Sequence, residues 1–256
     1  MIKAIFFDID GTLVSFQTHE VPASTRHALT TLRQNGIKIF IATGRGKDGL
    51  GVLEGITFDG YITLNGQYDY VGTNVIYENH LAKEDLEILL QEISKHPFPC
   101  GFTMENKKVF NYRDERVDYI HSITHNDNHP AGDVSNVVNE KVYQCMCFID
   151  AKEEEQLMKK LTNCVSSRWY HTFCDISPKG GTKQLGIAKL LEYYGIDISE
   201  TMAFGDGGND VQMLKSVAVG VAMGNSEEAL KQVATYVTDD VDHDGIAKAL
   251  AHYGLI

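Results

Sequence analysis

Short apolar segments that alternate with helical patterns constrain the fold of this chain more than any other feature. The segments are apolar along most of their length, which is typical of strands buried on both faces of a parallel sheet. Two of the helical patterns between them stop at a glycine, Gly36 or Gly195. This alternation predicts a doubly wound α/β core with a Rossmann-like parallel sheet. We expect strands at residues 4–7, 37–42, 60–64, 202–205, 217–221 and 236–238, and helices at 24–35, 182–194, 210–215 and 226–234.

The middle of the chain follows a different pattern. A helical stripe at 83–96 is followed by short strand patterns in pairs, at 101–104 with 109–112 and at 167–170 with 173–176. A further strand at 142–149 and a helix at 153–161 lie between these pairs. We therefore expect an inserted α+β domain over residues 83–178. The core would then be discontinuous, formed by residues 1–82 and 179–256.

The charge balance limits the partners that this chain can bind. It has 23 Lys and Arg against 35 Asp and Glu, a net charge of −12. A broad nucleic-acid interface needs a basic face, so we expect no nucleic acid partner. An anionic substrate would be repelled by the overall field, and it must be held by local donors or by a metal ion.

Cysteine content and hydropathy bear on the compartment. The five cysteines are an odd number without framework spacing, and no apolar run reaches the roughly 18 residues of a membrane helix. We expect no signal sequence, no membrane partner and a reducing cytoplasm. Cys145 and Cys147 share one face of an expected strand. We expect them to pack in a core, because the usual zinc-ligand spacing is absent.

Asp8 and Asp10 follow directly after the first apolar strand, and Gly11 turns the chain. Two carboxylates this close repel each other, so they need a cation, a shared proton or a large pKa shift. Mg2+ is the usual solution when phosphate is the substrate. The alternative is a solvated turn at the strand end.

A second acidic turn, Gly205-Asp206-Gly207-Gly208-Asn209-Asp210, follows another apolar strand. Its glycines could suggest a dinucleotide loop, but Asp206 and Asp210 would then face a pyrophosphate. Ligation of a metal ion fits the charges better.

Two further segments carry groups suited to a phosphate. Thr43-Gly44-Arg45 ends the strand at 37–42, and its hydroxyl and backbone N–H groups could donate to phosphate oxygens. A helix cap is the alternative interpretation. Lys183 lies just before a core helix, where it could balance the paired acids, although lysines are usually solvated.

Taken together, Asp8-Ile9-Asp10-Gly11-Thr12, Thr43-Gly44-Arg45, the Lys183 segment and Gly205–Asp210 resemble the four motifs of the haloacid dehalogenase superfamily. The C-terminal pattern with Gly224-Asn225, Tyr236-Val237-Thr238 and Asp244-Gly245 is similar to the Cof-type subfamily. The resemblance covers residues 3 to about 250, and the inserted segment has the position and size of a type IIB cap.

The resemblance implies a division of labour between the two N-terminal aspartates. Asp8 matches the nucleophile that attacks phosphorus and forms an aspartyl-phosphate. Asp10 matches the general acid that protonates the leaving alkoxide and then the base that activates water. Lys183 matches the catalytic lysine. The implied activity is hydrolysis of small phosphorylated metabolites, sugar phosphates first.

The resemblance also implies two ligand sets. Mg2+ would be held by Asp8, the main-chain carbonyl of Asp10, Asp206 and Asp210, the last of which could instead orient Lys183 or a water. Phosphate or substrate groups would be bound by Thr43, Gly44, Arg45 and Asn209. Arg45 and Asn65-Gly66 could also meet the organic half of the substrate.

Other functions stay open. A phosphomutase of the phosphomannomutase type would share this plan, and a non-catalytic phosphometabolite-binding module is a different class. The oligomeric state is open as well. His121, His125 and His129 recur at a spacing that suggests a metal site, but the polar surroundings of residues 121–130 predict a solvated loop.

Overall fold

The computed structural model describes residues 1–124 and 129–256, which divide by their contacts into two units. The first comprises Met1–Arg45, Leu50–Glu78 and Gly181–Ile256, and the second comprises Gly46–Gly49 and Asn79–Gly180. We call them the core unit and the cap unit. The long segment of the cap unit thus begins at residue 79 and ends at residue 180, whereas we expected residues 83 and 178 from the sequence.

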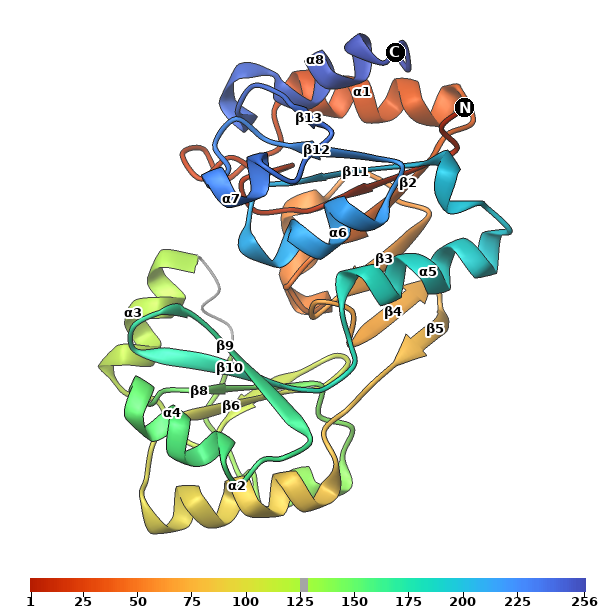
Figure 1. Cartoon of the computed structure of the whole chain (residues 1–256). Helices are drawn as coiled ribbons and strands as arrows, with labels where there is room; N and C mark the ends of the chain where they lie inside the picture. Colours follow the sequence, from red (N-terminus) through yellow and green to blue (C-terminus); the bar gives the residue numbers. More distant parts are fainter. Residues whose placement is uncertain (125–128) are drawn as a thin grey trace. The chain divides into compact units, whose positions relative to one another are not determined.

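The core unit is built on one sheet in the order β13-β12-β11-β1-β2-β3-β4-β5 (Figure 1). Its first six strands in this order run parallel, and β4 and β5 are added as an antiparallel hairpin. The parallel strands confirm the predicted α/β class, whereas the hairpin was not expected. The strands are β1 Ala4–Phe7, β2 Lys38–Ala42, β3 Gly60–Thr63, β4 Tyr68–Val71, β5 Asn74–Glu78, β11 Thr201–Gly205, β12 Val219–Ala222 and β13 Tyr236–Val237.

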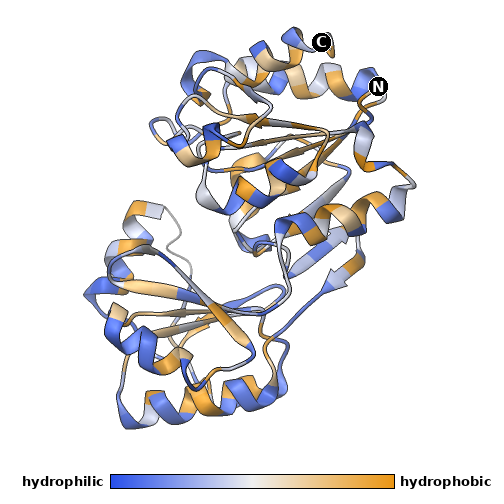
Figure 2. Ribbon diagram, viewed as in Figure 1, coloured by the Kyte–Doolittle hydropathy of each residue, from blue (hydrophilic) through white to orange (hydrophobic). Residues whose placement is uncertain are grey.

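Helices cover both faces of this sheet because successive strand residues point to opposite sides. In β1, Ile5 and Phe7 pack in one apolar cluster with α1 and α8, whereas Ala4 and Phe6 pack in another with α5, α6 and α7. Figure 2 shows apolar residues along the strands, while the outer helices carry both hydrophobic and hydrophilic residues. The helices are α1 Ala23–Gln34, α5 Lys183–Tyr194, α6 Val211–Ser216, α7 Glu228–Lys231 and α8 Gly245–His252, with 3-10 turns at Lys47–Leu53, Ile198–Glu200, Gly208–Asp210 and Val241–His243.

The cap unit has its own antiparallel sheet, in the order β7-β6-β8-β10-β9. One face packs with α2 and α4, and the other packs with α3. This is the α+β composition expected for the insertion, although α3 was not predicted. The elements are α2 Lys83–Lys95, β6 Cys100–Thr103, β7 Lys108–Phe110, α3 Glu115–Thr124, a 3-10 turn Val137–Asn139, β8 Gln144–Cys147, α4 Ala151–Met158, β9 Cys164–Tyr170 and β10 Phe173–Pro178.

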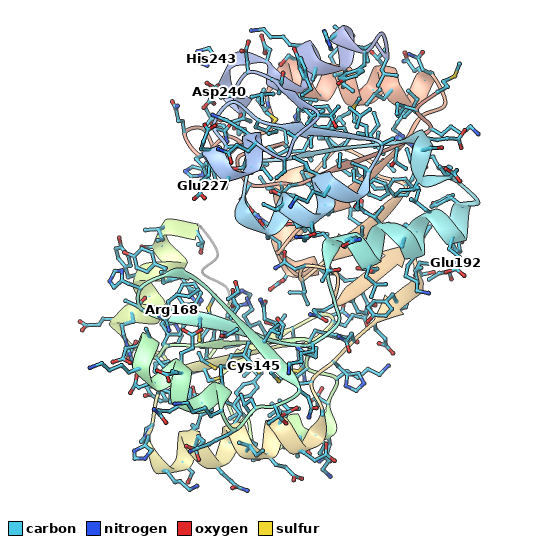
Figure 3. The ribbon with its side chains drawn as sticks, in the orientation of Figure 1. Cys145, Arg168, Glu192, Glu227, Asp240 and His243 are labelled. Atoms are coloured by element: carbon cyan, nitrogen blue, oxygen red, sulfur yellow. The ribbon has the colours of Figure 1, made fainter. Side chains whose placement is uncertain are left out.

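All five cysteines are free and buried, and all belong to the cap unit. Cys145 lies among its strands (Figure 3), and Cys147 is fully buried nearby. The prediction that these two thiols pack in a core is therefore confirmed.

The prediction of a solvated loop at residues 121–130 is wrong at both described histidines. His121 lies in α3 and is buried beside Phe110, with the two ring centroids 5.4 Å apart. His129 is also buried. The reason is that Val117, Ile120 and His121 share the inner face of a helix that the sequence pattern did not reveal. His125 lies outside the described residues.

Within the described ranges, no helix is both long enough and apolar enough to cross a membrane.

Candidate active site

The predicted site residues of the core unit gather where its central strands end. β1 pairs in parallel with β11 on one side and with β2 on the other. Carboxyl ends of parallel neighbours meet at one edge of the sheet, so Asp8, Asp206 and Thr43 emerge close together. The backbone N–H of Asp8 continues the ladder and donates to the carbonyl of Phe204 at 3.0 Å.

Lys183 forms the centre of a buried charge cluster. Its Nζ lies 2.5 Å from Asp8 Oδ1 and 2.7 Å from Asp210 Oδ1. Its side chain is only 1% exposed. Burial alone would lower the pKa of Lys183, but the charges of Asp210 and Asp8 outweigh burial and raise it. Lys183 is therefore the positive partner of Asp8 and Asp210 in the cluster.

The helix that carries Lys183 is fixed at both ends. Thr182 caps it, because its hydroxyl oxygen accepts a hydrogen bond from the N–H of Leu185 at 3.1 Å. Gly195 ends it in the left-handed conformation, with φ at 64°. Lys183 thus enters the cluster from the first turn of a well-defined helix.

Asp206 is the third acid of the cluster and is less enclosed than Asp8 and Asp210. Its carboxylate accepts hydrogen bonds from the hydroxyl of Thr12 at 3.0 Å and from the amide of Asn225 at 3.3 Å. Burial, together with the charge of Asp210, raises the pKa of Asp206 to about 7. Burial also raises the pKa of Asp8 well above its usual range, against the pull of Lys183.

These acids suit a divalent cation. One carboxylate oxygen from each of Asp8, Asp206 and Asp210 falls within a common distance of 4.8 Å. Two buried carboxylates, Asp8 and Asp210, and the half-buried Asp206 face one ammonium group, so the cluster has an excess of negative charge, and its donors are hard oxygens. The residues present therefore fit a divalent metal ion.

Asp210 is nevertheless occupied with other partners. Its Oδ1 accepts from Lys183, and its Oδ2 accepts from the backbone N–H groups of Asp206 at 3.1 Å and Gly207 at 3.0 Å. This geometry favours the option in which Asp210 orients Lys183 and the acidic turn.

Asp10 and Arg45 form a two-pronged ion pair beside the cluster. Arg45 Nε lies 2.9 Å from Asp10 Oδ2, and Nη2 lies 2.6 Å from Oδ1. Such fork-to-fork pairing fixes the plane of the carboxylate. Arg45 was predicted to bind substrate or phosphate; the structure places its guanidinium on Asp10.

Thr43, Gly44 and Asn209 lie close together through Asn65, which the sequence predicted only as a contact for the organic half of the substrate. Asn209 Nδ2 donates to Asn65 Oδ1 at 3.0 Å, and the Asn65 amide also lies against Gly44. The Thr43 hydroxyl is buried and accepts from the N–H of Arg45 at 3.1 Å.

Asn225 also belongs to the site, and it was not among the predicted site residues. Its amide donates to the carbonyl of Gly11 at 2.9 Å as well as to Asp206, so it ties the C-terminal part of the chain to the first acidic turn. Its only sequence signal was its place in the subfamily pattern.

The fold and this site define a hydrolase with an α/β core, an acidic centre and an inserted cap. The chain belongs to the haloacid dehalogenase-like hydrolase family, which it matches over residues 5–250. It is 35% identical over 257 residues to YkrA of Bacillus subtilis, whose name assigns it provisionally to the phosphatases; the match covers 99% of this chain and 98% of YkrA.

Solved structures agree with this placement. One is described as a sugar phosphatase of HAD subclass IIB; it is 42% identical, with a TM-score of 0.89, and the match covers 99% of this chain and 100% of that one. Another, from a study of HAD phosphatases of Bacteroides thetaiotaomicron, is 35% identical with a TM-score of 0.90, covering 100% and 96%. The chain is thus a phosphatase of the Cof type with a type IIB cap.

Proposed function

We propose that this enzyme is an Mg2+-dependent phosphatase that hydrolyses small phosphorylated metabolites, sugar phosphates above all, through an aspartyl-phosphate. The observation that carries the proposal is the buried cluster in which Lys183 contacts both Asp8 and Asp210, with Asp206 alongside. The similarity to a solved sugar phosphatase supports the substrate class.

Mg2+ prefers carboxylate and carbonyl oxygens, and it would be held by the carboxylates of Asp8 and Asp206 and the main-chain carbonyl of Asp10. Asp210 is not a ligand of the ion in this scheme; it orients Lys183 instead. When bound, the ion would neutralise charge on the phosphoryl oxygens.

Asp8 is the nucleophile in this proposal. An oxygen of its carboxylate forms a bond to phosphorus while the ester P–O bond breaks, and the leaving alkoxide takes a proton from Asp10. Asp10 then removes a proton from water, which attacks the phosphorus of the aspartyl-phosphate. Inorganic phosphate leaves, and Asp8 is restored.

Lys183, Thr43, Gly44 N–H and Asn209 bind the non-bridging oxygens in this scheme, where charge must be stabilised. Arg45 holds Asp10, and the side of the Arg45 guanidinium that faces away from Asp10 contacts the substrate. The cap unit selects the organic half of the substrate. We place the enzyme in the cytoplasm, a reducing compartment that suits five free cysteines.

A phosphate-release screen tests this function. Sugar phosphates, nucleotides, FMN and pyridoxal phosphate are offered with Mg2+, and in parallel with EDTA. We expect release only with Mg2+ and fastest with a sugar phosphate. Asp8→Asn should abolish release with an unchanged melting temperature, while Asp242→Asn, an exposed acid, serves as the matched control.

The intermediate is tested separately by rapid acid quenching and intact-protein mass spectrometry. We expect a mass gain of one phosphoryl group in the wild type and none in Asp8→Asn. Retained turnover in Asp8→Asn would overturn the nucleophile assignment. Interconversion of hexose 1- and 6-phosphates without phosphate release would overturn hydrolysis in favour of a mutase.

A further inference from the structure

The turn that follows β3 has an unusual backbone. Leu64, Asn65 and Gly66 lie in succession in the left-handed region, with φ of 52°, 55° and 87°. Glycine and asparagine tolerate this region, but leucine does so only under constraint from its surroundings. Leu64 is also buried. Three consecutive left-handed residues therefore indicate that the surrounding structure imposes the conformation, a situation that recurs at functional sites.

The backbone of this turn holds the Thr43-Gly44-Arg45 loop. The N–H of Leu64 donates to the carbonyl of Arg45 at 2.9 Å, and the N–H of Asn65 donates to the carbonyl of Thr43, also at 2.9 Å. Both bonds depend on the left-handed geometry, because it turns successive N–H groups towards the same loop.

The same turn also packs against the start of the Lys183 helix. A Cβ atom at Gly66 would lie 2.2 Å from the carbonyl oxygen of Thr182, the residue that caps α5. Only glycine fits there, so the turn lies directly against the residue before Lys183. Two segments of the predicted phosphate site are therefore held by one turn.

The side chain of Asn65 reaches a third segment. Its Oδ1 accepts from Asn209 Nδ2 at 3.0 Å. On its other side, the position that a Cβ of Gly44 would take lies 3.2 Å from Asn65 Nδ2. An amide nitrogen carries two hydrogens in a fixed plane, so accepting one of them at Asn65 sets the direction of the other.

We propose that Asn65 is a positioning residue of the phosphatase, which orients the Asn209 amide and seats the Gly44 loop for the phosphoryl group. It acts through Asn209 and not on the reacting atoms. This inference rests on the proposed function, since it assigns a role within the same phosphate site.

The first test distinguishes the contribution of the Asn65 side-chain amide to activity from that of its left-handed backbone. Asn65→Gly keeps a residue that adopts the left-handed turn freely and removes only the amide. We expect its kcat/KM to fall about tenfold to a hundredfold, with inhibition by orthovanadate weakened in parallel. Asn35→Gly, on the exposed end of α1, is the matched control and should retain wild-type kinetics.

A double-mutant cycle with Asn209→Ala tests whether Asn65 acts through Asn209. If Asn65 acts through Asn209, the double variant should lose no more than Asn209→Ala alone. Fully additive losses, or wild-type kinetics in Asn65→Gly, would overturn the proposal. A merely structural role would instead lower the melting temperature without coupling to Asn209.

Binding of inorganic phosphate in the presence of Mg2+, measured by calorimetry, gives a readout independent of turnover. We expect the same non-additive pattern there. If the wild type binds phosphate but hydrolyses no substrate, the proposed function fails while the positioning role is still measured. If Asn65→Gly binds phosphate as tightly as the wild type does, the positioning role fails.

Discussion

Arg45 determines where the carboxylate of Asp10 lies, because it holds both oxygens at hydrogen-bonding distance. Arg45→Met should therefore impair proton transfer more than binding. We expect kcat for a sugar phosphate to fall about a hundredfold, the usual scale of general acid catalysis. Hydrolysis of p-nitrophenyl phosphate should fall much less, because its leaving group needs no proton.

Arg45→Lys is the control for this prediction. It keeps the charge but cannot form the two-pronged pair, so its activity should fall between the wild type and Arg45→Met. Equal losses on both substrates, or a change confined to KM, would show that Arg45 serves the substrate instead of Asp10.

Asp69 should make the protein less stable as the pH rises. It is fully buried in β4, and neither of its carboxylate oxygens has a hydrogen-bond partner among the described residues. Burial raises its pKa from 3.8 to about 8. Between these values the folded protein keeps a proton that the unfolded chain has lost, so stability falls by up to about 1.4 kcal/mol per pH unit.

Asp69→Asn cannot ionise, and it should remove this slope. We expect its melting temperature to approach that of the wild type near pH 4 and to exceed it increasingly up to pH 8, followed by circular dichroism. A constant difference across this range would show that Asp69 is ionised in the folded protein.

At the residue scale, the gathering of the charged cluster was predictable from the sequence, whereas the residues that hold it in place were not. Asp8, Asp206 and Asp210 carry strong signals, because charged groups at the ends of apolar strands are hard to explain otherwise, whereas Lys183 was singled out by its place at a core helix and by the family resemblance. Asn65 and Asn225 are neutral loop residues with no periodic pattern. Their partners come from segments 144 and 214 positions away in the chain, which only the folded structure brings together.

At the scale of elements, the position of α5 depends on Gly186. A Cβ atom there would lie 2.7 Å from the Cγ2 of Ile62 and 2.8 Å from the Oδ2 of Asp69. Gly186→Ala would gain about 1 kcal/mol of helix propensity on an exposed helix, but overpacking here costs about 1–3 kcal/mol. We expect a lower melting temperature together with reduced kcat, since Lys183 lies one turn away on the displaced helix.

Gly51→Ala is the matched control, because its Cβ would meet nothing within 4 Å. It should match the wild type in both melting temperature and kcat. Wild-type activity in Gly186→Ala would show that Lys183 tolerates a shift of its helix.

The elements themselves were predictable where their pattern was clear. Wholly apolar strands such as β1 and β11 were recognised, because both of their faces are buried. The β4–β5 hairpin was missed, since buried Asp69 interrupts the apolar run. α3 was missed because its inner face includes His121, whose burial depends on packing against Phe110.

At the scale of the whole molecule, the insertion was recognisable because the chain changes from strand–helix alternation to paired short strands. What the pattern could not show is that each unit has a complete core. Every buried residue of the two clusters around α2, α3 and α4 belongs to the cap unit, and every one in the two core-unit clusters belongs to the core unit.

These separate cores predict that the two units fold independently. The long cap segment begins and ends side by side, since Asn79 Nδ2 donates to the carbonyl of Lys179 at 3.0 Å. Residues 79–180 alone should therefore melt cooperatively, and a core with this segment replaced by a short Gly-Ser linker should still bind Mg2+.

Because the acidic cluster lies wholly in the core unit, the linked core should hydrolyse p-nitrophenyl phosphate, but it should lose its preference among sugar phosphates. Asp8→Asn in the same linked core is the control for residual hydrolysis. A cap fragment without a cooperative transition, or a linked core that keeps full sugar selectivity, would contradict this division of labour.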